Sequence, residues 1–371
     1  MKKIAIIGAN EFQNPLIEKA KEMGFETHVF AWEAGDIGER TADVFHPISI
    51  TEKQAIWDVC RAVGVAACCS IGSDLAVGTV NYIQRKLGNP CNPEITDTVA
   101  TDKYEMRQAL RDAGVACPGF LKVRAVPAAE ALAGLTYPMI VKPTDRSGSR
   151  GIFKVTNYAE LSAAVPQSIA QSFGRQAIIE EFIDGPEYSC ESVSFEGEHT
   201  VLALTKKHTT GTPHFIETGH VEPSDIPAEL IPTVHGQVKA ALDALHIQYG
   251  ASHAEFKLAS DGRVRIIEVG ARMGGDCIGS DLVYLSTGID FMAAVIDTAL
   301  GKAPDLAVKR PPCQAEIRFI FDEDDLNALE HVRQTAPDTL WRWTYDGQVA
   351  GKVTDSSNRH GYWITTGALQ G

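Results

Sequence analysis

Apolar and polar positions in the first hundred residues follow two alternating patterns. Short apolar runs predict strands, and longer stretches with helical periodicity predict helices. The predicted strands cover 3–7, 27–32 and 66–71, and the predicted helices cover 15–23, 53–63 and 75–87. Strands that alternate with helices favour βαβ units and a parallel sheet. We therefore expect an N-terminal α/β domain at residues 1–97, with a linker at 89–93.

A different pattern follows the linker. A helix is predicted from Asp102 to about Asp112, and strands are predicted at 137–143, 152–155 and 176–183. A helical pattern also runs from 157 to about 173, where Pro166 should break it because proline lacks the N–H that a helix interior uses. This combination suits a compact α+β unit, which we place at residues 98–184.

Strands and helices continue to the end of the chain. Residues 185–308 include strand-like runs and a strongly apolar helix at 291–300. Residues 309–312 read as a break, and 309–371 carries short strands separated by turns. We therefore expect a C-terminal α+β domain followed by a small β-rich portion.

Composition limits the classes of function. The 371 residues are 44% hydrophobic and 22% charged, as in an ordinary globular protein, and the formal net charge is −14. This charge argues against a nucleic-acid partner or an anionic membrane surface, because both need a basic face. No apolar run approaches the roughly eighteen residues of a transmembrane helix. The eight cysteines form no Cys-x-x-Cys pair, which favours free thiols in a cytoplasmic protein. A homodimer is the default expectation.

The end of the first predicted strand weakens one function class. It reads Gly8-Ala-Asn10 and lacks Gly-x-Gly-x-x-Gly, so a dinucleotide-dependent dehydrogenase loses its main support. Ligands still bind at the carboxyl ends of parallel strands. Asn10, Glu11 and the Ser73-Asp74 turn are therefore candidate substrate contacts, although ordinary turn and helix-cap roles are the stronger interpretation.

Two glutamates carry the clearest chemical signal. Glu255 and Glu268 lie in alternating runs on either side of the turn Ser260-Asp-Gly262, which predicts a hairpin. Pairing these strands would bring both carboxylates to one face, where they repel each other unless a cation bridges them. Mg²⁺ is commonly held by one or two carboxylates together with substrate phosphates. Arg272 follows and could bind phosphate or carboxylate. The alternative is an exposed hairpin with solvated acids.

A second group of residues suits a triphosphate. Lys142 ends a predicted strand just before a loop that contains Ser147, Gly148, Ser149 and Gly151. Such a loop can cradle phosphate with its backbone N–H groups and can close over a nucleotide. Lys103, at the start of its helix, could supply a second cation. The plain alternatives are a hairpin turn and a solvated helix residue.

The next predicted strand suits the nucleoside. Apolar residues at 178–183 could wall an adenine, and backbone groups from Glu181 to Ile183 could bond its edge. Glu187 lies just beyond, where a carboxylate could accept hydrogen bonds from ribose hydroxyls. The alternative is an edge strand with one charged face.

The order of these parts resembles the ATP-grasp superfamily along essentially the whole chain. The matching pieces are Thr101-Asp-Lys103, Gly114-Val-x-x-Pro118, Val141-Lys-Pro143, Ser147-Gly-Ser-Arg-Gly151, Glu180-Glu-Phe-Ile183 with Glu187, Glu255 and Glu268-x-x-x-Arg272. The resemblance implies the ATP-grasp fold, with 98–184 as its lid. It also implies an enzyme that uses ATP and Mg²⁺, or Mn²⁺ in its place, to convert a carboxylate into an acyl phosphate that an amine captures.

The same resemblance assigns roles to residues. Lys103 and Lys142 would bind the nucleotide under the 147–151 loop, and Glu180 would also belong to the nucleotide site. Glu181 and Ile183 would form the adenine hinge, and Glu187 would hold the ribose. Glu255 and Glu268 would bind Mg²⁺, while Lys142 and Arg272 would offset developing negative charge. One position departs from the family pattern: Gly270 stands where many members have an asparagine that binds a second Mg²⁺.

A later segment bears on the substrate. Phe215-x-Glu217-x-Gly-His220, with the segments 314–320 and 355–361, resembles the branch that contains bacterial L-amino-acid ligases and carnosine synthase. Glu217 and His220 are then candidates to contact an amino-acid amine, with His220 as a proton acceptor. Arg272, Gly274 and Asp276 would shape the same pocket. The alternative is a solvated surface loop.

Three functions stay open at this point. The first is a ligase that joins an amino acid to an amine or a second amino acid, both of them small molecules. The second is a purine-pathway type of ATP-grasp ligase or carboxylase that acts on a ribotide, for which we find no additional basic cluster. The third is a non-catalytic nucleotide-binding protein.

Overall fold

The N-terminal region contains a parallel sheet flanked by helices. The computed structural model describes residues 1–212, 215–349 and 352–369. The sheet has the order β3-β2-β1-β4, and its pairs are parallel. Its elements are β1 (Lys2–Ile7), α1 (Asn14–Glu22), β2 (Phe25–Phe30), α2 (Ile37–Thr41), β3 (Val44–His46), α3 (Lys53–Val63), β4 (Ala67–Cys69) and α4 (Asp74–Leu87). The predicted parallel α/β sheet is confirmed. Sequence analysis missed β3 and α2, which are too short to show a clear period.

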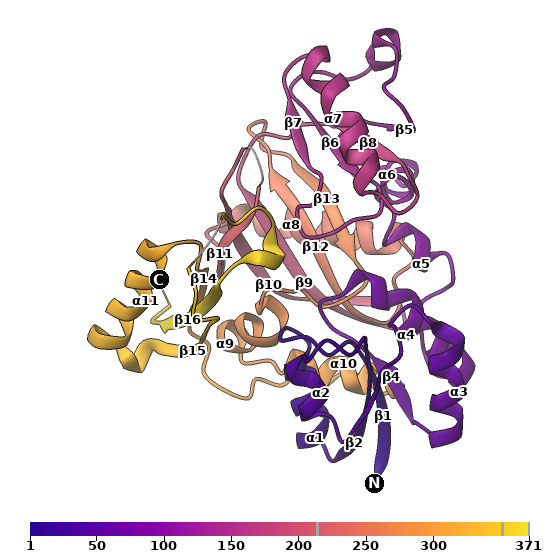
Figure 1. Cartoon of the computed structure of the whole chain (residues 1–371), viewed down its shortest axis with the longest axis vertical. Helices are drawn as coiled ribbons and strands as arrows, with labels where there is room; N and C mark the ends of the chain where they lie inside the picture. The colour runs from indigo at the N-terminus through magenta and orange to yellow at the C-terminus, as the bar shows by residue number, and fades with distance from the viewer. Residues whose placement is uncertain (213–214, 350–351, 370–371) are drawn as a thin grey trace.

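A separate antiparallel sheet, which we call the lid sheet, follows in the chain. Its order is β5-β8-β6-β7. Its elements are β5 (Phe120–Val123), β6 (Met139–Pro143), β7 (Phe153–Val155), α7 (Tyr158–Gln171) and β8 (Ala177–Glu181), and two helices, α5 (Thr96–Val99) and α6 (Lys103–Asp112), precede it. The hydrophobic cluster of the lid sheet draws all its described members from residues 121–179. The lid sheet therefore has a core of its own at the top of Figure 1.

The break predicted at Pro166 is wrong, because α7 continues through this residue. Pro166 lies on the exposed face of the helix, where water can reach the carbonyl group that it leaves without an N–H partner. The opposite face buries Leu161, Ala164 and Val165 in the core of the lid sheet. Burial of these apolar side chains outweighs the lost hydrogen bond.

The largest sheet is antiparallel and has the order β13-β12-β9-β10-β11-β14-β16-β15. Its strands are β9 (Glu187–Phe195), β10 (Glu198–Thr209), β11 (Glu217–Glu222), β12 (Gly250–Leu258), β13 (Val264–Gly270), β14 (Gln314–Phe319), β15 (Leu340–Tyr345) and β16 (Gly361–Gly367), and the helices along this part of the chain are α8 (Ile231–Ala244), α9 (Val283–Thr287), α10 (Phe291–Ala299) and α11 (Glu323–Thr335). One hydrophobic cluster joins α10, β9 and β12 to α1 and β2. The N-terminal sheet is thus packed against the large sheet (Figure 1).

The C-terminal strands extend the large sheet. β14 pairs with β11, and β16 and β15 follow it to the sheet edge. Sequence analysis predicted short strands here but missed α11, which buries only Leu329 among its residues and so shows a weak apolar stripe. The domain limits at 97/98, 184/185 and 308/309 stay predictions.

The predicted hairpin of the two glutamates is confirmed. β12 and β13 pair in an antiparallel manner with Glu255 directly opposite Glu268, and the register shifts just after this pair. β12 also pairs with β9 on its other side, so the hairpin forms one edge of the large sheet and is not an isolated ribbon. Within the described residues, no helix is both long and apolar enough to cross a bilayer.

Candidate active site

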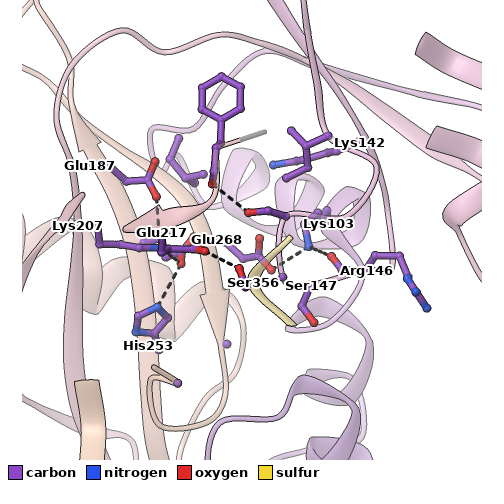
Figure 2. Close-up of a pocket in the computed structure, with 18 of the residues that line it drawn as sticks. Lys103, Lys142, Arg146, Ser147, Glu187, Lys207, Glu217, His253, Glu268 and Ser356 are labelled. Carbon is purple, nitrogen blue, oxygen red and sulfur yellow. Dashed lines mark hydrogen bonds and ion pairs between the residues drawn. The ribbon is translucent and has the colours of Figure 1, made fainter. Parts of the chain in front are cut away.

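A cavity of about 330 Å³ lies between the lid sheet and the large sheet, next to the end of β13. It brings together residues from segments that are far apart in the sequence, several of which are drawn in Figure 2. Every predicted site residue lines it except Gly151 and Gly274. Gly151 lies against Gln171 and Pro143 in the lid, and the Gly274 N–H is turned to the buried Glu191 at 2.9 Å. Of the earlier candidates at the N-terminal sheet, Asp74 lines the cavity, whereas Asn10 and Glu11 do not.

The two predicted nucleotide lysines both point into the cavity but have different acidic partners. Lys103 Nζ lies 2.8 Å from Glu268 Oε1 and donates to the carbonyl oxygen of Arg146 at 2.8 Å. Lys142 Nζ lies 2.7 Å from Glu180, which also pairs with the buried Arg107 at 2.6 Å. Burial lowers the pKa of Lys142, whereas Glu268 overcomes burial and raises the pKa of Lys103. Both lysines are held in place by buried or half-buried carboxylates.

Lys207 is a cavity residue that sequence analysis missed. It is buried on β10, and its Nζ contacts Glu255, lies 3.3 Å from Glu187 and lies 3.9 Å from Glu217. Figure 2 shows Lys207 together with Glu187 and Glu217. Its period-two alternation with the buried Ala203 and Thr205 was a signal for an inward position. The three acids outweigh the effect of burial and hold the pKa of Lys207 well above its usual value.

His253 and Glu191 form a second feature that sequence analysis did not assign. They are register partners on β12 and β9, and the His253 Nδ1 bonds the Glu191 carboxylate, which is fully buried. The other ring nitrogen lies 3.3 Å from Glu255. Glu191 overcomes the effect of burial and raises the pKa of His253 to about 9, so the ring carries a positive charge at neutral pH. The pairing of β12 with β9 creates the His253–Glu191 contact, so no local sequence motif indicates it.

Arg272 is held by Asp74, an acid from the N-terminal region. Its Nε lies 2.7 Å and its second guanidinium nitrogen 3.1 Å from the two oxygens of Asp74, at the start of α4. A Cβ at Gly270 would lie 3.0 Å from both Arg272 Nε and Asp74 Oδ1. The ion pair therefore fills the space that a side chain at 270 would need, which accounts for glycine at this position.

The part of the cavity lined by Glu217, Asp276 and Ser356, which we call the Arg359 end, is held by an arginine behind the lining whose side chain is 5% exposed. Arg359 donates to both oxygens of Asp276 at 2.6 and 2.9 Å, and to the Ser356 carbonyl at 3.0 Å. Ser356 in turn donates through its hydroxyl to Glu217 at 2.7 Å. Arg359 lies outside the residues that sequence analysis named as a site, although it was part of the quoted 355–361 segment.

His220 is buried beside the Arg359–Asp276 pair. Its Nε2 is 3.6 Å from Asp276, and neither ring nitrogen has a hydrogen-bond partner within the described chain. Burial lowers the pKa of His220 despite the nearby carboxylate, so the ring is neutral at pH 7. A neutral imidazole with unpaired nitrogens at a cavity wall can accept a proton or a hydrogen bond from a ligand.

The loop predicted to cover phosphates has the expected backbone. Ser149, Gly148 and Gly151 have positive φ values of 59°, 71° and 69°. The Ser149 hydroxyl donates to the Phe215 carbonyl at 3.1 Å, so the loop reaches across the cavity to the segment before β11. Pro213 and His214, in the segment that precedes Glu217, lie outside the described residues.

The acids at 255 and 268 fit one end of a divalent-metal site. They face each other in register and belong to separate strands, and each is neutralised here by a lysine. Among the residues that the structure describes, no cluster of three or more His, Cys, Asp or Glu side chains is arranged to hold a metal alone. Two carboxylates therefore suit Mg²⁺ only if a nucleotide supplies further oxygens, which is how this ion is usually bound.

A comparison with protein families matches a segment that contributes many of the residues lining this cavity. Residues 135–281 match the family model described as "ATP-grasp domain". The chain contains an ATP-grasp domain. The matched part of this ATP-grasp domain includes Lys142, Glu255 and Glu268, whereas Lys103, Asp74 and Arg359 lie outside it. The predicted fold class is confirmed.

Individual relatives and solved structures match more of the chain than the family model does. Carnosine synthase 1 of Gallus gallus is 27% identical over 84% of this chain and 37% of that protein. The L-amino acid ligase from Bacillus licheniformis is 26% identical, covers 100% of this chain and 94% of its own, and has a TM-score of 0.82. Phosphoribosylglycinamide synthetase from Anaerococcus prevotii is 21% identical over 99% and 94%, with a TM-score of 0.78, and shares the fold alone. The chain spans about half the length of several curated relatives that it matches.

Proposed function

We propose that this protein is an ATP-dependent carboxylate–amine ligase that releases ADP and phosphate. The observation that carries the proposal is the register pair Glu255–Glu268, flanked by Lys103 and Lys207 in a cavity of the ATP-grasp domain. In the proposed reaction, a substrate carboxylate oxygen attacks the γ-phosphorus of ATP and ADP leaves. An amine then attacks the acyl carbon, loses a proton, and phosphate leaves.

The nucleotide end would position the triphosphate. Glu255 and Glu268 would hold Mg²⁺, which when bound neutralises phosphate charge and orients the γ-phosphate. Lys103 and Lys142 would face the phosphate oxygens, and the 147–151 loop would cover them. The lid sheet can close as a unit because its hydrophobic cluster lies within residues 121–179.

The nucleoside would lie at the carboxyl end of β8, a strand that pairs with β5 on one side and β6 on the other. Glu181 accepts hydrogen bonds from the Thr136 hydroxyl at 2.8 Å and from the backbone of Gly119 at 3.3 Å, which fixes the chain at the end of this strand. With the Glu181 side chain turned to the lid, backbone groups up to Ile183 would recognise adenine. Glu187 would accept hydrogen bonds from the ribose.

The other substrates would bind at the Arg359 end. Arg272, held by Asp74, would bind the substrate carboxylate or the acyl phosphate. Glu217 would bind the ammonium form of the incoming amine, and the neutral His220 would accept the proton that the amine must lose. Similarity to carnosine synthase 1 and to an L-amino acid ligase supports an amino acid as one of the two substrates.

An activity panel tests the proposal. ADP release would be measured with Mg–ATP and each amino acid, singly and in pairs, and separately with bicarbonate and an aminoimidazole ribotide. We expect release that needs two amino acids, or an amino acid and another amine, with a product whose mass is the sum of both less one water. Release only with the ribotide would replace this proposal by a purine-pathway activity. No release under any condition, with nucleotide still bound, would indicate a binding protein.

A further inference from the structure

Lys207 has no role in the proposed reaction, yet it occupies the centre of the acidic wall of the cavity. The lysine lies on β10, and its three acidic neighbours lie on three other strands: Glu187 on β9, Glu217 on β11 and Glu255 on β12. Its side chain is only 4% exposed. An ammonium group buried among three carboxylates is fixed by charge, so its position bears on every ligand that binds to those acids.

The acids proposed for Mg²⁺ are both neutralised before any ligand binds. Lys207 pairs with Glu255, and Lys103 pairs with Glu268 at 2.8 Å. A divalent cation that entered alone would meet two ammonium groups at these carboxylates, and at Glu255 also the charged ring of His253 at 3.3 Å. Like charges repel strongly in a pocket that excludes water, because the effective dielectric constant is low. The metal ion by itself is therefore a poor ligand for this site.

A triphosphate changes this balance. Its oxygens supply negative charge to both the metal ion and the displaced ammonium group of Lys207. The triphosphate therefore replaces the partner that Lys207 loses when the metal ion binds Glu255. Lys207 does not have to leave the cavity for this exchange, since Glu187 at 3.3 Å and Glu217 at 3.9 Å remain beside it. A small turn of its side chain away from Glu255 is enough.

We propose that Lys207 makes the binding of metal and of nucleotide depend on each other, by neutralising Glu255 until both arrive together. This inference rests on the proposed metal and nucleotide site but not on the identity of the other substrates. Because linkage is reciprocal, the metal raises the affinity for nucleotide by the same factor as the nucleotide raises the affinity for metal. The device suppresses metal binding in the empty enzyme.

The test compares binding constants in Lys207→Met, which keeps the aliphatic stem and removes the charge. Affinity for Mn²⁺ alone would be measured by electron paramagnetic resonance, and affinity for a non-hydrolysable ATP analogue, with and without metal, by calorimetry. We expect Mn²⁺ alone to bind at least tenfold more tightly than in the wild type. We expect the analogue without metal to bind more weakly, and the linkage factor to fall at least tenfold.

Two control variants separate this effect from a general change of charge. Lys206→Met changes the neighbouring residue of β10, whose side chain pairs with Asp225 outside the cavity. Lys257→Met removes a lysine that lines the same cavity and lies 3.8 Å from Glu187 without pairing with Glu255. Both should keep the wild-type linkage factor. If Lys207→Met does not fold, Lys207→Gln gives the same comparison.

The possible outcomes distinguish the two proposals. If the wild type binds metal and analogue with strong linkage but Lys207→Met keeps that linkage, the role of Lys207 is overturned and the proposed function stands. If the wild type binds no analogue in the presence of Mn²⁺, the nucleotide site itself is wrong. Tighter Mn²⁺ binding in Lys257→Met equal to that in Lys207→Met would reduce the effect to net charge and overturn the inference.

Discussion

The nucleotide end of the cavity holds its charges in ion pairs that a ligand can separate, whereas the opposite end locks them together. Lys103 pairs with Glu268 through one contact at 2.8 Å, and both side chains face the cavity. Arg359, by contrast, grips Asp276 through two hydrogen bonds and stacks on the Phe319 ring at 3.6 Å from its centroid. Bidentate, stacked arginine is far more restricted than a single ammonium contact.

This difference suggests two tasks for one cavity. In the proposed reaction, the nucleotide end would exchange partners during each cycle, because metal and phosphate would replace the lysine–glutamate pairs. The Arg359 end would keep its shape and would recognise the proposed substrate with groups already in place, which lowers the cost of ordering them on binding. Substitutions at the first end should therefore act on chemistry and nucleotide binding, and those at the second on stability and on the affinity for the amine.

The largest effect is expected for Glu268→Gln, which removes one carboxylate of the metal pair. ADP release should fall by about 10²–10³, the usual cost of losing one group that stabilises transition-state charge. The measurement is the steady-state rate with saturating Mg–ATP. Glu198→Gln, an exposed glutamate on β10, is the matched control and should keep full activity. Equal rates in both variants would contradict the metal role.

Breaking the locked end should act mainly on stability. Arg359→Met leaves Asp276 without its partner, and unfolding in urea should show a loss of about 3 kcal/mol. The double variant Arg359→Met with Asp276→Asn should recover much of this loss, because no charge then lacks a partner. In the double variant, the KM for the amine should rise about tenfold, a 1.4 kcal/mol effect, while the KM for ATP stays unchanged. A rise in both would show that the ends are not independent.

A buried acid on the same strand as Glu217 and His220 makes the stability of the protein depend on pH. Glu222 is fully buried, and burial raises its pKa to about 8, although Thr205 and Ser286 donate hydrogen bonds to it. The folded protein therefore keeps this proton between pH 4.5 and about 8, whereas the unfolded chain loses it. Stability from this group is complete at low pH and declines as the pH rises through that window.

Glu222→Gln should remove this dependence. Relative to the variant, the wild type should lose on the order of 3 kcal/mol of unfolding free energy between pH 5 and pH 8, at about 1.4 kcal/mol for each pH unit. Urea unfolding at several pH values measures it. Parallel curves for the two proteins across this range would mean that Glu222 is ionised in the folded state.

The smallest effect is expected at Gly270, which lies against the Arg272–Asp74 pair. Gly270→Asn should push the Arg272–Asp74 pair out of place and lower kcat about tenfold, since small shifts of a positioning group are costly. Gly236→Ala, where an added Cβ meets nothing within 4 Å, should leave kcat unchanged. A Gly270→Asn enzyme with wild-type kcat would show that Arg272 is not held in a required position.

The parts of the site that sequence analysis predicted all carry a local signal. The hairpin at Ser260–Gly262 set the register that brings Glu255 opposite Glu268, and the glycines at 148 and 151 marked the loop. Lys207 and the His253–Glu191 pair were missed because their contacts join neighbouring strands. The order of strands in a sheet cannot be predicted from a single segment of sequence. The break at Pro166 was wrongly predicted for the opposite reason. Burial of the apolar face of α7 outweighs the local tendency of proline to end a helix.

The account depends most on a carboxylate oxygen passing from the substrate to phosphate. A substrate acid labelled with ¹⁸O in its carboxylate, supplied with its amine partner and Mg–ATP, tests this transfer directly by mass analysis of the released phosphate. We predict one labelled oxygen in the phosphate for each product formed. Unlabelled phosphate released together with ADP and product would contradict the acyl-phosphate route and with it the proposed function of this cavity.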